Sequence, residues 1–210
     1  MTNETRLDRI AICGGTFDPF HNGHLLPLLD AFPRMRWSRI IVLPALRQPF
    51  KHDRPAASSY HRFAMAVLAT EHDPRIEVSP LELERGEVSY SVDTLEELRR
   101  QNPGTALEWV IGDDNLAALL RWKTIDRILE LANFVVLARH PSPDLVPPEL
   151  RDRVLPPARR EGAGAIVFAE NEVIAVSASE IRRRIGAKES IETLVHPRVA
   201  RYIRRLGLYA

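Results

Sequence analysis

The sequence lacks several features that mark special classes of protein. Its 210 residues include one cysteine, Cys13, so no disulfide can form within the chain. No apolar run approaches the roughly 20 residues of a transmembrane helix, and no apolar signal region follows the polar residues 1–6. The net charge of +1 creates no field that would demand nucleic acid or an anionic membrane. These absences predict a cytoplasmic protein that binds neither.

Size and composition limit the architecture. Hydrophobic residues make up 45% of the chain, which is enough to bury one substantial core. The length fits one large domain or two small ones, and we expect one domain spanning residues 1–210. Cys13 lies within an apolar run, where packing is a more natural role for a thiol than reactivity.

Short β-rich runs alternate with helical patterns along the chain. The runs cover residues 10–13, 40–43, 76–78, 109–111, 134–137 and 166–168. Amphipathic periodicity predicts helices at residues 60–70, 92–100 and 125–131. This alternation indicates an α/β fold, a Rossmann-like doubly wound sheet that is mostly parallel with helices on both faces. Ligands then belong at the carboxyl ends of the strands.

Two proline-rich segments interrupt the alternation. Residues 44–55 follow a strand end and predict a mobile loop over the site. Residues 141–157 are less regular, and we expect them to pack outside the core. Residues 197–208 predict an amphipathic helix with its arginines outward. A solvated face explains these arginines better than an RNA-binding patch, because no stacking aromatics are interleaved.

The most informative segment follows the first apolar run and reads GGTFDPFHNGH, residues 14–24. Paired glycines let the backbone approach a ligand that a Cβ atom would exclude. Pro27 fits only the first turn of a helix, so we expect the helix to begin near Gly23 or His24. A helix start suits phosphate, and a spacing of three brings His21 and His24 to one side. The segment therefore predicts a nucleotide-phosphate site.

This segment resembles the signature of the nucleotidylyltransferase superfamily, with its (H/T)xGH histidine motif. The resemblance implies catalytic roles for His21 and His24, while Asp18 fixes the turn rather than acting in acid–base chemistry. It also implies backbone contacts to ATP from four residues: Gly14, Gly15, Thr16 and Phe17. A dinucleotide-binding GxGxxG pattern is absent, which disfavours an ordinary NAD-dependent dehydrogenase.

A second phosphate cradle is predicted late in the chain. Ser177 or Ser179 can cap a helix, and Arg182 lies about one turn from its start. A capped helix start beside a guanidinium suits an anion, although a routine capped helix with a surface arginine fits equally. The segment resembles the ISxTxIR element of the superfamily, with Val176 and Ser179 replacing isoleucine and threonine. This match implies that Ser179 and Arg182 bind the triphosphate of ATP, with Ser177 beside them and Arg182 also catalytic.

Residues 109–115 lead from a strand into a glycine and two carboxylates. These carboxylates can accept ribose hydroxyls or cap a helix. The run looks like the family's IIGxD element, which assigns ribose recognition to Asp114 and close backbone approach to Gly112.

Residues 88–95 and 121–123 resemble the SYTxxTL and TW(Y/K)-type segments of bacterial nicotinate-nucleotide adenylyltransferases. The resemblance implies carboxylate recognition by backbone N–H groups near Ser91 and Lys123. Trp122 can stack on a pyridinium ring, or it can anchor a loop while half-buried. Lys123 departs from the aromatic residue of some members, and its side chain either adds charge near the carboxylate or points to solvent.

Two further residues follow from the same resemblance. Lys51 lies in the proline-rich loop where family members carry a PPHK-like sequence, and it is expected to contact substrate or phosphate. Arg139 follows a strand where members place an adenine-site arginine, although His140 displaces the usual following proline.

The resemblance covers about residues 10–208 and implies transfer of AMP from ATP to nicotinate mononucleotide, with release of pyrophosphate. Such transfers depend on positioning and charge neutralisation more than on a protein nucleophile. Mg²⁺ is expected to be held mainly by the substrate phosphates, because no acidic cage of protein ligands is apparent.

Other functions stay open at this point. Nicotinamide mononucleotide or phosphopantetheine could be the acceptor. A class I aminoacyl-tRNA synthetase relative shares the histidine motif, but the chain lacks room for a tRNA-reading domain. A non-catalytic nucleotide-binding module is the remaining alternative. The sequence does not decide the oligomeric state, and a homo-oligomer is compatible with it.

Overall fold

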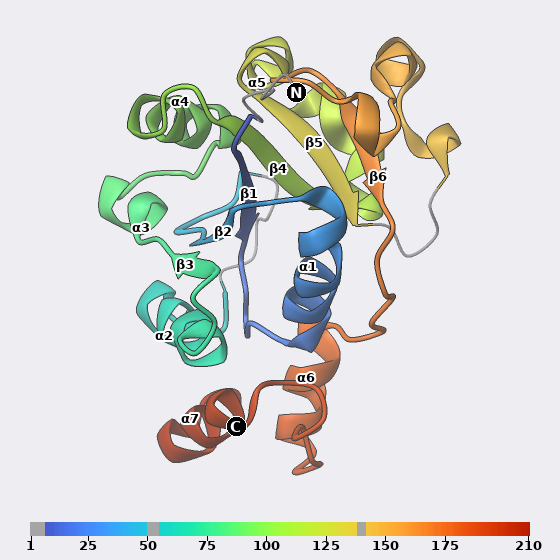
Figure 1. Ribbon diagram of the computed structural model, residues 1–210. Coiled ribbons are helices and arrows are strands. Elements are labelled where there is room, and N and C mark those ends of the chain that lie inside the picture. The colour runs from blue at the N-terminus through green and yellow to red at the C-terminus, as the bar shows by residue number, and fades with distance from the viewer. Residues whose placement is uncertain (1–6, 50–54, 138–141) are drawn as a thin grey trace.

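A six-stranded sheet runs through the centre of the molecule (Figure 1). The computed structural model describes residues 7–49, 55–137 and 142–210. All strand pairs are parallel, in the spatial order β3-β2-β1-β4-β5-β6. The strands are β1 (Arg9–Gly15), β2 (Arg39–Pro44), β3 (Ile76–Val78), β4 (Ala106–Gly112), β5 (Ala132–Leu137) and β6 (Ile166–Ala169). Every predicted β-rich run lies within one of them.

Helices connect most of the strands. They are α1 (Asn22–Met35), α2 (Ser59–Thr70), α3 (Leu81–Arg85), α4 (Ser91–Gln101), α5 (Ile125–Leu131), α6 (Ala178–Gly186) and α7 (Pro197–Leu206). The described residues also form the 3₁₀ helices η1 (Asp113–Arg121), η2 (Pro143–Leu145), η3 (Pro148–Arg153) and η4 (Pro157–Arg159). The three helices predicted between strands correspond to α2, α4 and α5, and the predicted carboxyl-terminal helix corresponds to α7.

Alternate side chains of the strands enter two separate cores. Val110 and Val135 pack in the core that contains α1, α2, α6 and α7. Their neighbours Trp109, Ile111 and Phe134 pack in the core that contains α4, α5 and η1. Successive side chains of a strand point to opposite faces of the sheet, so the helices cover both faces. The predicted doubly wound α/β fold is confirmed.

The proline-rich residues 142–157 contradict the expectation that they pack outside the core. Val146 and Leu150 are only 1% and 5% exposed and belong to the second core. Prolines begin η2 and η3, where their fixed φ suits a helical turn and their missing N–H costs nothing. Short turns of this kind let a proline-rich segment bring apolar side chains inward.

Helix α1 also differs from its prediction. It begins at Asn22, one residue before the expected start, and Pro27 lies in its second turn with Pro33 further along. The assumption that Pro27 requires the first turn was therefore wrong. Each proline removes one backbone hydrogen bond, but Leu28 and Met35 are fully buried in the first core. Tertiary packing of this apolar face outweighs the lost bonds.

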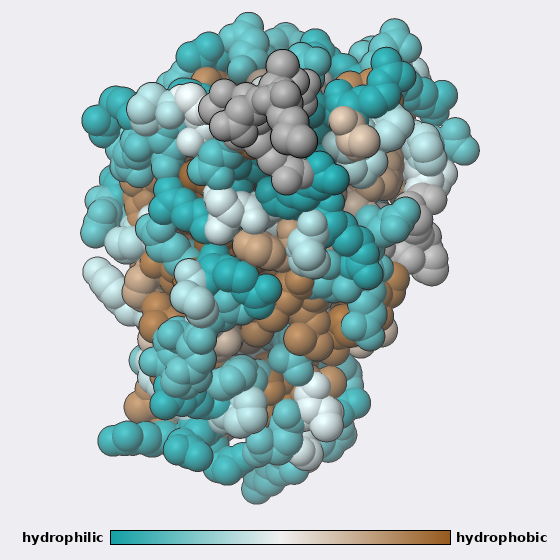
Figure 2. Space-filling view, in the orientation of Figure 1, coloured by the Kyte–Doolittle hydropathy of each residue, from teal (hydrophilic) through white to brown (hydrophobic). Residues whose placement is uncertain are grey.

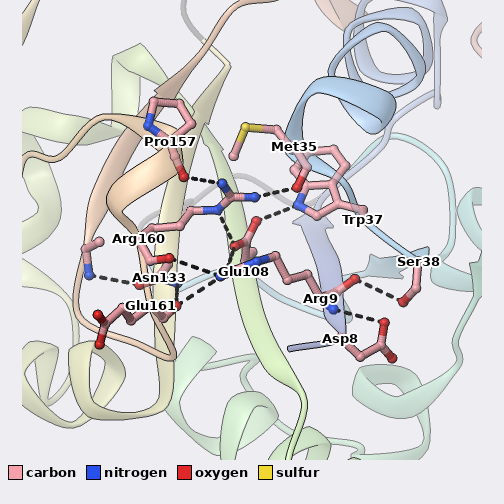
Figure 3. A network of polar contacts seen from close by, with 11 residues as sticks. Asp8, Arg9, Met35, Trp37, Ser38, Glu108, Asn133, Pro157, Arg160 and Glu161 are labelled. Atoms are coloured by element: carbon pink, nitrogen blue, oxygen red, sulfur yellow. Dashed lines mark hydrogen bonds and ion pairs between the residues drawn. The ribbon is translucent and has the colours of Figure 1, made fainter. Parts of the chain in front are cut away.

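A buried carboxylate occupies the half of β4 away from Gly112 (Figure 3). Glu108 is 0% exposed. It accepts hydrogen bonds from Arg9 Nη1 at 2.8 Å, Arg160 Nε at 2.6 Å and Trp37 Nε1 at 2.5 Å. The Arg160 guanidinium also donates to the carbonyl of Met35. The network joins β1, β4, the end of α1 and the residue after η4. No sequence motif predicts it.

The surface around α7 matches its prediction. Its arginines 198, 201, 204 and 205 are exposed, and Arg198 and Arg204 form ion pairs with Glu71 and Glu192. Figure 2 shows that the lower part of this face, where Figure 1 has α6 and α7, is mostly hydrophilic. Within the described ranges, no helix combines the length and apolarity needed to cross a membrane.

Candidate active site

A cavity of about 1090 Å³ opens at the carboxyl ends of β1 and β4. The chain moves outward from β1 in one direction to β2 and in the other to β4, and ligand sites of doubly wound sheets lie at such a switch point. The wall contains most of the predicted site residues: Gly14, Gly15, Thr16, Phe17, His21, His24, Ser91, Gly112, Asp114, Trp122, Lys123, Ser177 and Ser179. Segments from the beginning, middle and end of the chain therefore meet at one place, as predicted.

The two histidines of the glycine–histidine turn (residues 14–24) stack on each other. Their ring centroids are 3.7 Å apart with an interplanar angle of 23°. His24 Nδ1 accepts the backbone N–H of His21 at 3.2 Å. Because Nδ1 is an acceptor, a neutral His24 carries its proton on Nε2. The pair lies on one side of the turn, with Nε2 of His24 as a donor.

The backbone donors at the start of α1 depart from the expectation that they serve a phosphate. The N–H of Asn22 donates to the Leu194 carbonyl at 2.9 Å, and the N–H of His24 donates to the His21 carbonyl at 2.8 Å. The Asn22 side chain also donates to the Thr193 carbonyl at 3.0 Å. The segment before α7 thus occupies part of the helix start, and an anion here depends more on the imidazoles.

The paired glycines are required by the wall itself. A Cβ atom on Gly14 would lie 3.0 Å from the Trp109 ring, and one on Gly15 would lie 2.6 Å from the Phe17 ring. Phe17 adopts a left-handed backbone with φ 53°, and its ring meets His24 edge to face at 5.0 Å between centroids. The glycines therefore let aromatic side chains shape the turn, in addition to any approach they permit to a ligand.

Cys13 lines the same cavity. Burial raises the pKa of its thiol to about 12, so the thiol stays protonated and poorly nucleophilic at neutral pH. This agrees with the packing role expected from the sequence.

The carboxylate of Asp18 holds the glycine–histidine turn. Asp18 is 6% exposed. Its Oδ2 accepts the N–H of Ala56 at 2.7 Å, while its Oδ1 accepts the N–H of Ala57 at 3.1 Å and the hydroxyl of Tyr209 at 2.7 Å. A carboxylate with three donors is committed to structure, which supports the expectation that Asp18 fixes the turn.

Arg62 of α2 was missed by the sequence analysis. It is 1% exposed, and its Nη1 donates to the Thr16 carbonyl at 2.5 Å while Nη2 donates to the Leu46 carbonyl at 3.3 Å. Burial lowers the pKa of its guanidinium, and the charge of Asp18 opposes that shift. Arg62 lies in a helical run without a motif, so only its tertiary contacts reveal that it supports the turn.

The late segment reaches the early turn. Ser177 caps α6, because its Oγ accepts the N–H of Glu180 at 3.2 Å. Arg182 Nη1 donates to the Asp18 carbonyl at 2.6 Å, and Nη2 donates to Ser179 Oγ at 3.3 Å. Its side chain is one-third exposed (33%) but is absent from the cavity wall. Arg182 therefore touches the turn itself, and two of its five N–H donors bond to residues that the structure describes.

The segment after β4 supplies an exposed carboxylate. Asp114 lies in η1, and its Oδ1 accepts from Asn115 Nδ2 at 3.1 Å. A Cβ atom on Gly112 would lie 2.5 Å from this same oxygen. Asp114 therefore occupies the space beside Gly112, and both residues line the cavity. The ribose contact expected of Asp114 stays a prediction.

The predicted acceptor side joins the start of α4 to the end of η1. Trp122 is half-buried and packs edge to face on Phe134, with centroids 5.6 Å apart. Lys123 Nζ lies 3.2 Å from Asp93 Oδ2 and 4.4 Å above the Tyr90 ring. Trp122 therefore anchors its loop while also lining the cavity. The Lys123 side chain does not simply point to solvent, because its charge is paired with Asp93.

Glu82 is a second residue that the sequence analysis missed. It lines the cavity but is only 3% exposed. Thr94 Oγ1 donates to its carboxyl at 2.9 Å, and the Ser89 hydroxyl is a further partner. Burial raises the pKa of this carboxyl despite these partners. A glutamate in the acidic run LELER is expected at the surface, so the sequence carried no signal for it.

Two predicted residues, Lys51 and Arg139, lie outside the described ranges. Nothing in the structure bears on their expected contacts with substrate and adenine.

Comparison with known proteins adds independent findings. Residues 12–184 match the family model described as cytidylyltransferase-like. Curated relatives named "probable nicotinate-nucleotide adenylyltransferase" include one from Gemmatimonas aurantiaca, 36% identical over 201 residues (96% of this chain, 92% of the relative). Another, from Moorella thermoacetica, is 36% identical over 210 residues (100% and 95%).

Solved structures resemble the chain in fold. Plasmodium falciparum nicotinic acid mononucleotide adenylyltransferase complexed with APC superposes with a TM-score of 0.72. The sequence identity is 19%, and the match covers 96% of this chain and 97% of that one. At this identity the likeness supports the α/β architecture alone.

Proposed function

This chain belongs to the cytidylyltransferase-like family, and from that premise we propose that it is a nicotinate-nucleotide adenylyltransferase. It transfers AMP from ATP to nicotinate mononucleotide in NAD biosynthesis. The 5′-phosphate oxygen of the mononucleotide attacks the α-phosphorus of ATP. The bond from the α-phosphorus to the β-phosphate bridging oxygen breaks, and pyrophosphate leaves as deamido-NAD forms.

One observation carries the donor half of this proposal: the histidine pair and Arg182 converge on the turn at Asp18. His24 Nε2 donates to the α-phosphate, where negative charge shifts during transfer. His21 and the remaining donors of Arg182 bind the other phosphates, with Ser177 and Ser179 beside them. The backbone of residues 14–17 lines the same wall, and Asp114 accepts a ribose hydroxyl.

The acceptor half is assigned to the wall built by Ser91, Trp122 and Lys123. The Trp122 ring stacks on the pyridine ring, while backbone N–H groups near Ser91 and Lys123 bind the carboxylate. Lys51 and Arg139 complete the site on the substrate and adenine sides respectively. The Asp93 partner of Lys123 reduces the free charge available to the carboxylate, so backbone donors carry the recognition.

Mg²⁺ is proposed to accompany ATP. Among residues 7–49, 55–137 and 142–210, no group of three or more His, Cys, Asp and Glu side chains could hold a metal ion. In the proposal, the ion would be carried mainly by phosphate oxygens and water. An ion bound to the triphosphate would neutralise charge on the leaving pyrophosphate.

Pyrophosphate release decides between the proposal and its alternatives. Purified protein is given ATP and Mg²⁺ with nicotinate mononucleotide, nicotinamide mononucleotide, phosphopantetheine or no acceptor. We expect the fastest release with nicotinate mononucleotide. Faster release with another acceptor would reassign the substrate. ATP binding without release in any mixture would favour a non-catalytic nucleotide-binding module.

Three broader predictions accompany this function. The catalytic unit is one domain over residues 1–210, the protein works in the cytoplasm, and a homo-oligomer is compatible with the fold. Sedimentation of the purified protein would measure the oligomeric state directly.

A further inference from the structure

We infer that Tyr209 is a positioning residue: through Asp18, its hydroxyl holds the glycine–histidine turn in the shape that binds the phosphates of ATP. This inference rests on the proposed use of that turn. Neither the sequence motifs nor the family resemblance point to Tyr209, which lies beyond the helix that follows the last of them.

The contact is short and shielded. The Tyr209 hydroxyl donates to Asp18 Oδ1 at 2.7 Å, and Asp18 is 6% exposed. Helix α7 ends at Leu206 and is capped by Gly207 in a left-handed conformation, and Tyr209 is itself left-handed with φ 66°. A left-handed tyrosine is uncommon, and this reversal brings the ring back to the turn. In Figure 1 the carboxyl terminus lies beside α6, below the end of β1.

Asp18 is the point at which the turn is fixed. It stands three residues before His21, and its two oxygens accept the N–H groups of Ala56 and Ala57 as well as the Tyr209 hydroxyl. Arg182 binds its backbone carbonyl. A change in the carboxylate's orientation would therefore act on the histidines, on the chain that leads into α2 and on α6 together.

The chemistry of the tyrosine suits this role. Burial and the bond to Asp18 raise the pKa of Tyr209 well above its ordinary value, so the phenol remains a neutral donor at neutral pH. The Asp18 charge lies close to the proposed phosphate site and would repel an anion if the carboxylate rotated toward it. A third donor keeps the carboxylate turned toward the protein.

The test compares two tyrosines of the same region. Tyr209→Phe removes only the hydroxyl, and we expect the Kd of a non-hydrolysable ATP analogue to rise about 3- to 10-fold by calorimetry. The KM for nicotinate mononucleotide should change less than about 2-fold. Tyr202→Phe is the matched control, because its hydroxyl bonds His61 Nδ1 at 2.9 Å away from the cavity wall. Both variants are expected to lose a similar amount of thermal stability, but Tyr202→Phe should bind the analogue like the wild type.

A double variant tests the route through Asp18. If Tyr209 acts through that carboxylate, Asp18→Asn combined with Tyr209→Phe should bind ATP no more weakly than Asp18→Asn alone. Wild-type affinity in Tyr209→Phe, or additive losses in the double variant, would overturn the inference. Because the titration needs no acceptor, a protein that binds ATP but ignores nicotinate mononucleotide would refute the proposed function while leaving this test intact.

Discussion

The bond from the His21 backbone to Nδ1 of His24 sets the chemistry of that ring. It leaves Nε2 to carry the proton, so His24 is prepared to donate to a phosphate oxygen without a change of tautomer. His24→Ala should lower kcat for pyrophosphate release by about two to four orders of magnitude. Far-ultraviolet circular dichroism should stay unchanged, since the helix keeps its buried face. Turnover close to that of the wild type would exclude His24 from the transfer step.

Glu82 gives a pH-dependent prediction. Burial raises its pKa above 4.5 in the folded protein, so the folded state binds this proton more tightly than the unfolded chain. The free energy of unfolding should therefore fall as pH rises from the ordinary pKa through the raised one. Urea unfolding of the wild type and Glu82→Gln between about pH 4 and pH 8 measures this, because glutamine has no proton to lose.

We expect the free energy of unfolding of the wild type minus that of Glu82→Gln to decrease as pH rises and then to become constant. Parallel stability curves for the two proteins would show that Glu82 has no such shift.

Single residues divide into those that sequence can locate and those that it cannot. The cavity residues of the glycine–histidine turn were predictable because their spacing and types carry the phosphate-binding pattern locally. Arg62, Glu82 and Tyr209 were not, because each acts through a partner distant in the chain, namely Thr16, Thr94 and Asp18. An amphipathic pattern does not distinguish a buried arginine from an exposed one.

Among elements, β1 and the turn that follows it show how a strand end is shaped for a site. A Cβ atom on Gly15 would come within 2.6 Å of the Phe17 ring, which packs on His24. Gly15→Ala should therefore displace Phe17, cost about 1–3 kcal/mol of stability and lower kcat. Gly186→Ala is the matched control, since nothing lies within 4 Å of its added methyl. It should change the free energy of unfolding, measured in urea, by less than about 1 kcal/mol.

If Gly15→Ala retains both full stability and full kcat, the packing account of this turn is wrong. Equal losses in the two alanine variants would point to a general backbone effect instead.

Strands were predicted better than the segments between them. Runs such as residues 134–137 are buried on both sides, so their composition alone marks them. The η2 and η3 turns were missed because prolines normally end regular structure, and here they begin 3₁₀ turns that bury Val146 and Leu150. The start of α1 was predicted one residue too late, because packing tolerates Pro27 beyond the first turn.

At the scale of the molecule, the Glu108 network joins both halves of the sheet away from the cavity (Figure 3). Glu108→Gln should lower the free energy of unfolding by about 3–5 kcal/mol, because Arg9 and Arg160 keep their buried charges without a counterion. The KM and kcat of the folded variant should stay unchanged. Glu77→Gln is the control: its pair with Arg39 is exposed, and losing it should cost less than about 1 kcal/mol.

If Glu108→Gln lowers the free energy of unfolding no more than Glu77→Gln does, the network does not stabilise the fold as proposed. Altered kinetic constants in a folded Glu108 variant would indicate that the network also reaches the active site.

The overall fold follows from the alternation of strands and helices along the chain. The order of strands and helices predicts a parallel sheet with two covered faces, and family membership confirms the superfamily resemblance carried by the motifs. The Glu108 network was beyond sequence analysis, because a glutamate inside an apolar run has no visible partner until β1, β4 and the residue after η4 are folded together.

The thiol of Cys13, the single cysteine of the sequence, offers a built-in probe of the cavity. Burial raises its pKa to about 12, which leaves only about one thiol in 10⁵ ionised at pH 7, so a disulfide reagent should consume it slowly. Because Cys13 is partly exposed in the cavity wall, the labelling rate would follow access to the cavity, and a nucleotide bound there would slow it without any introduced probe.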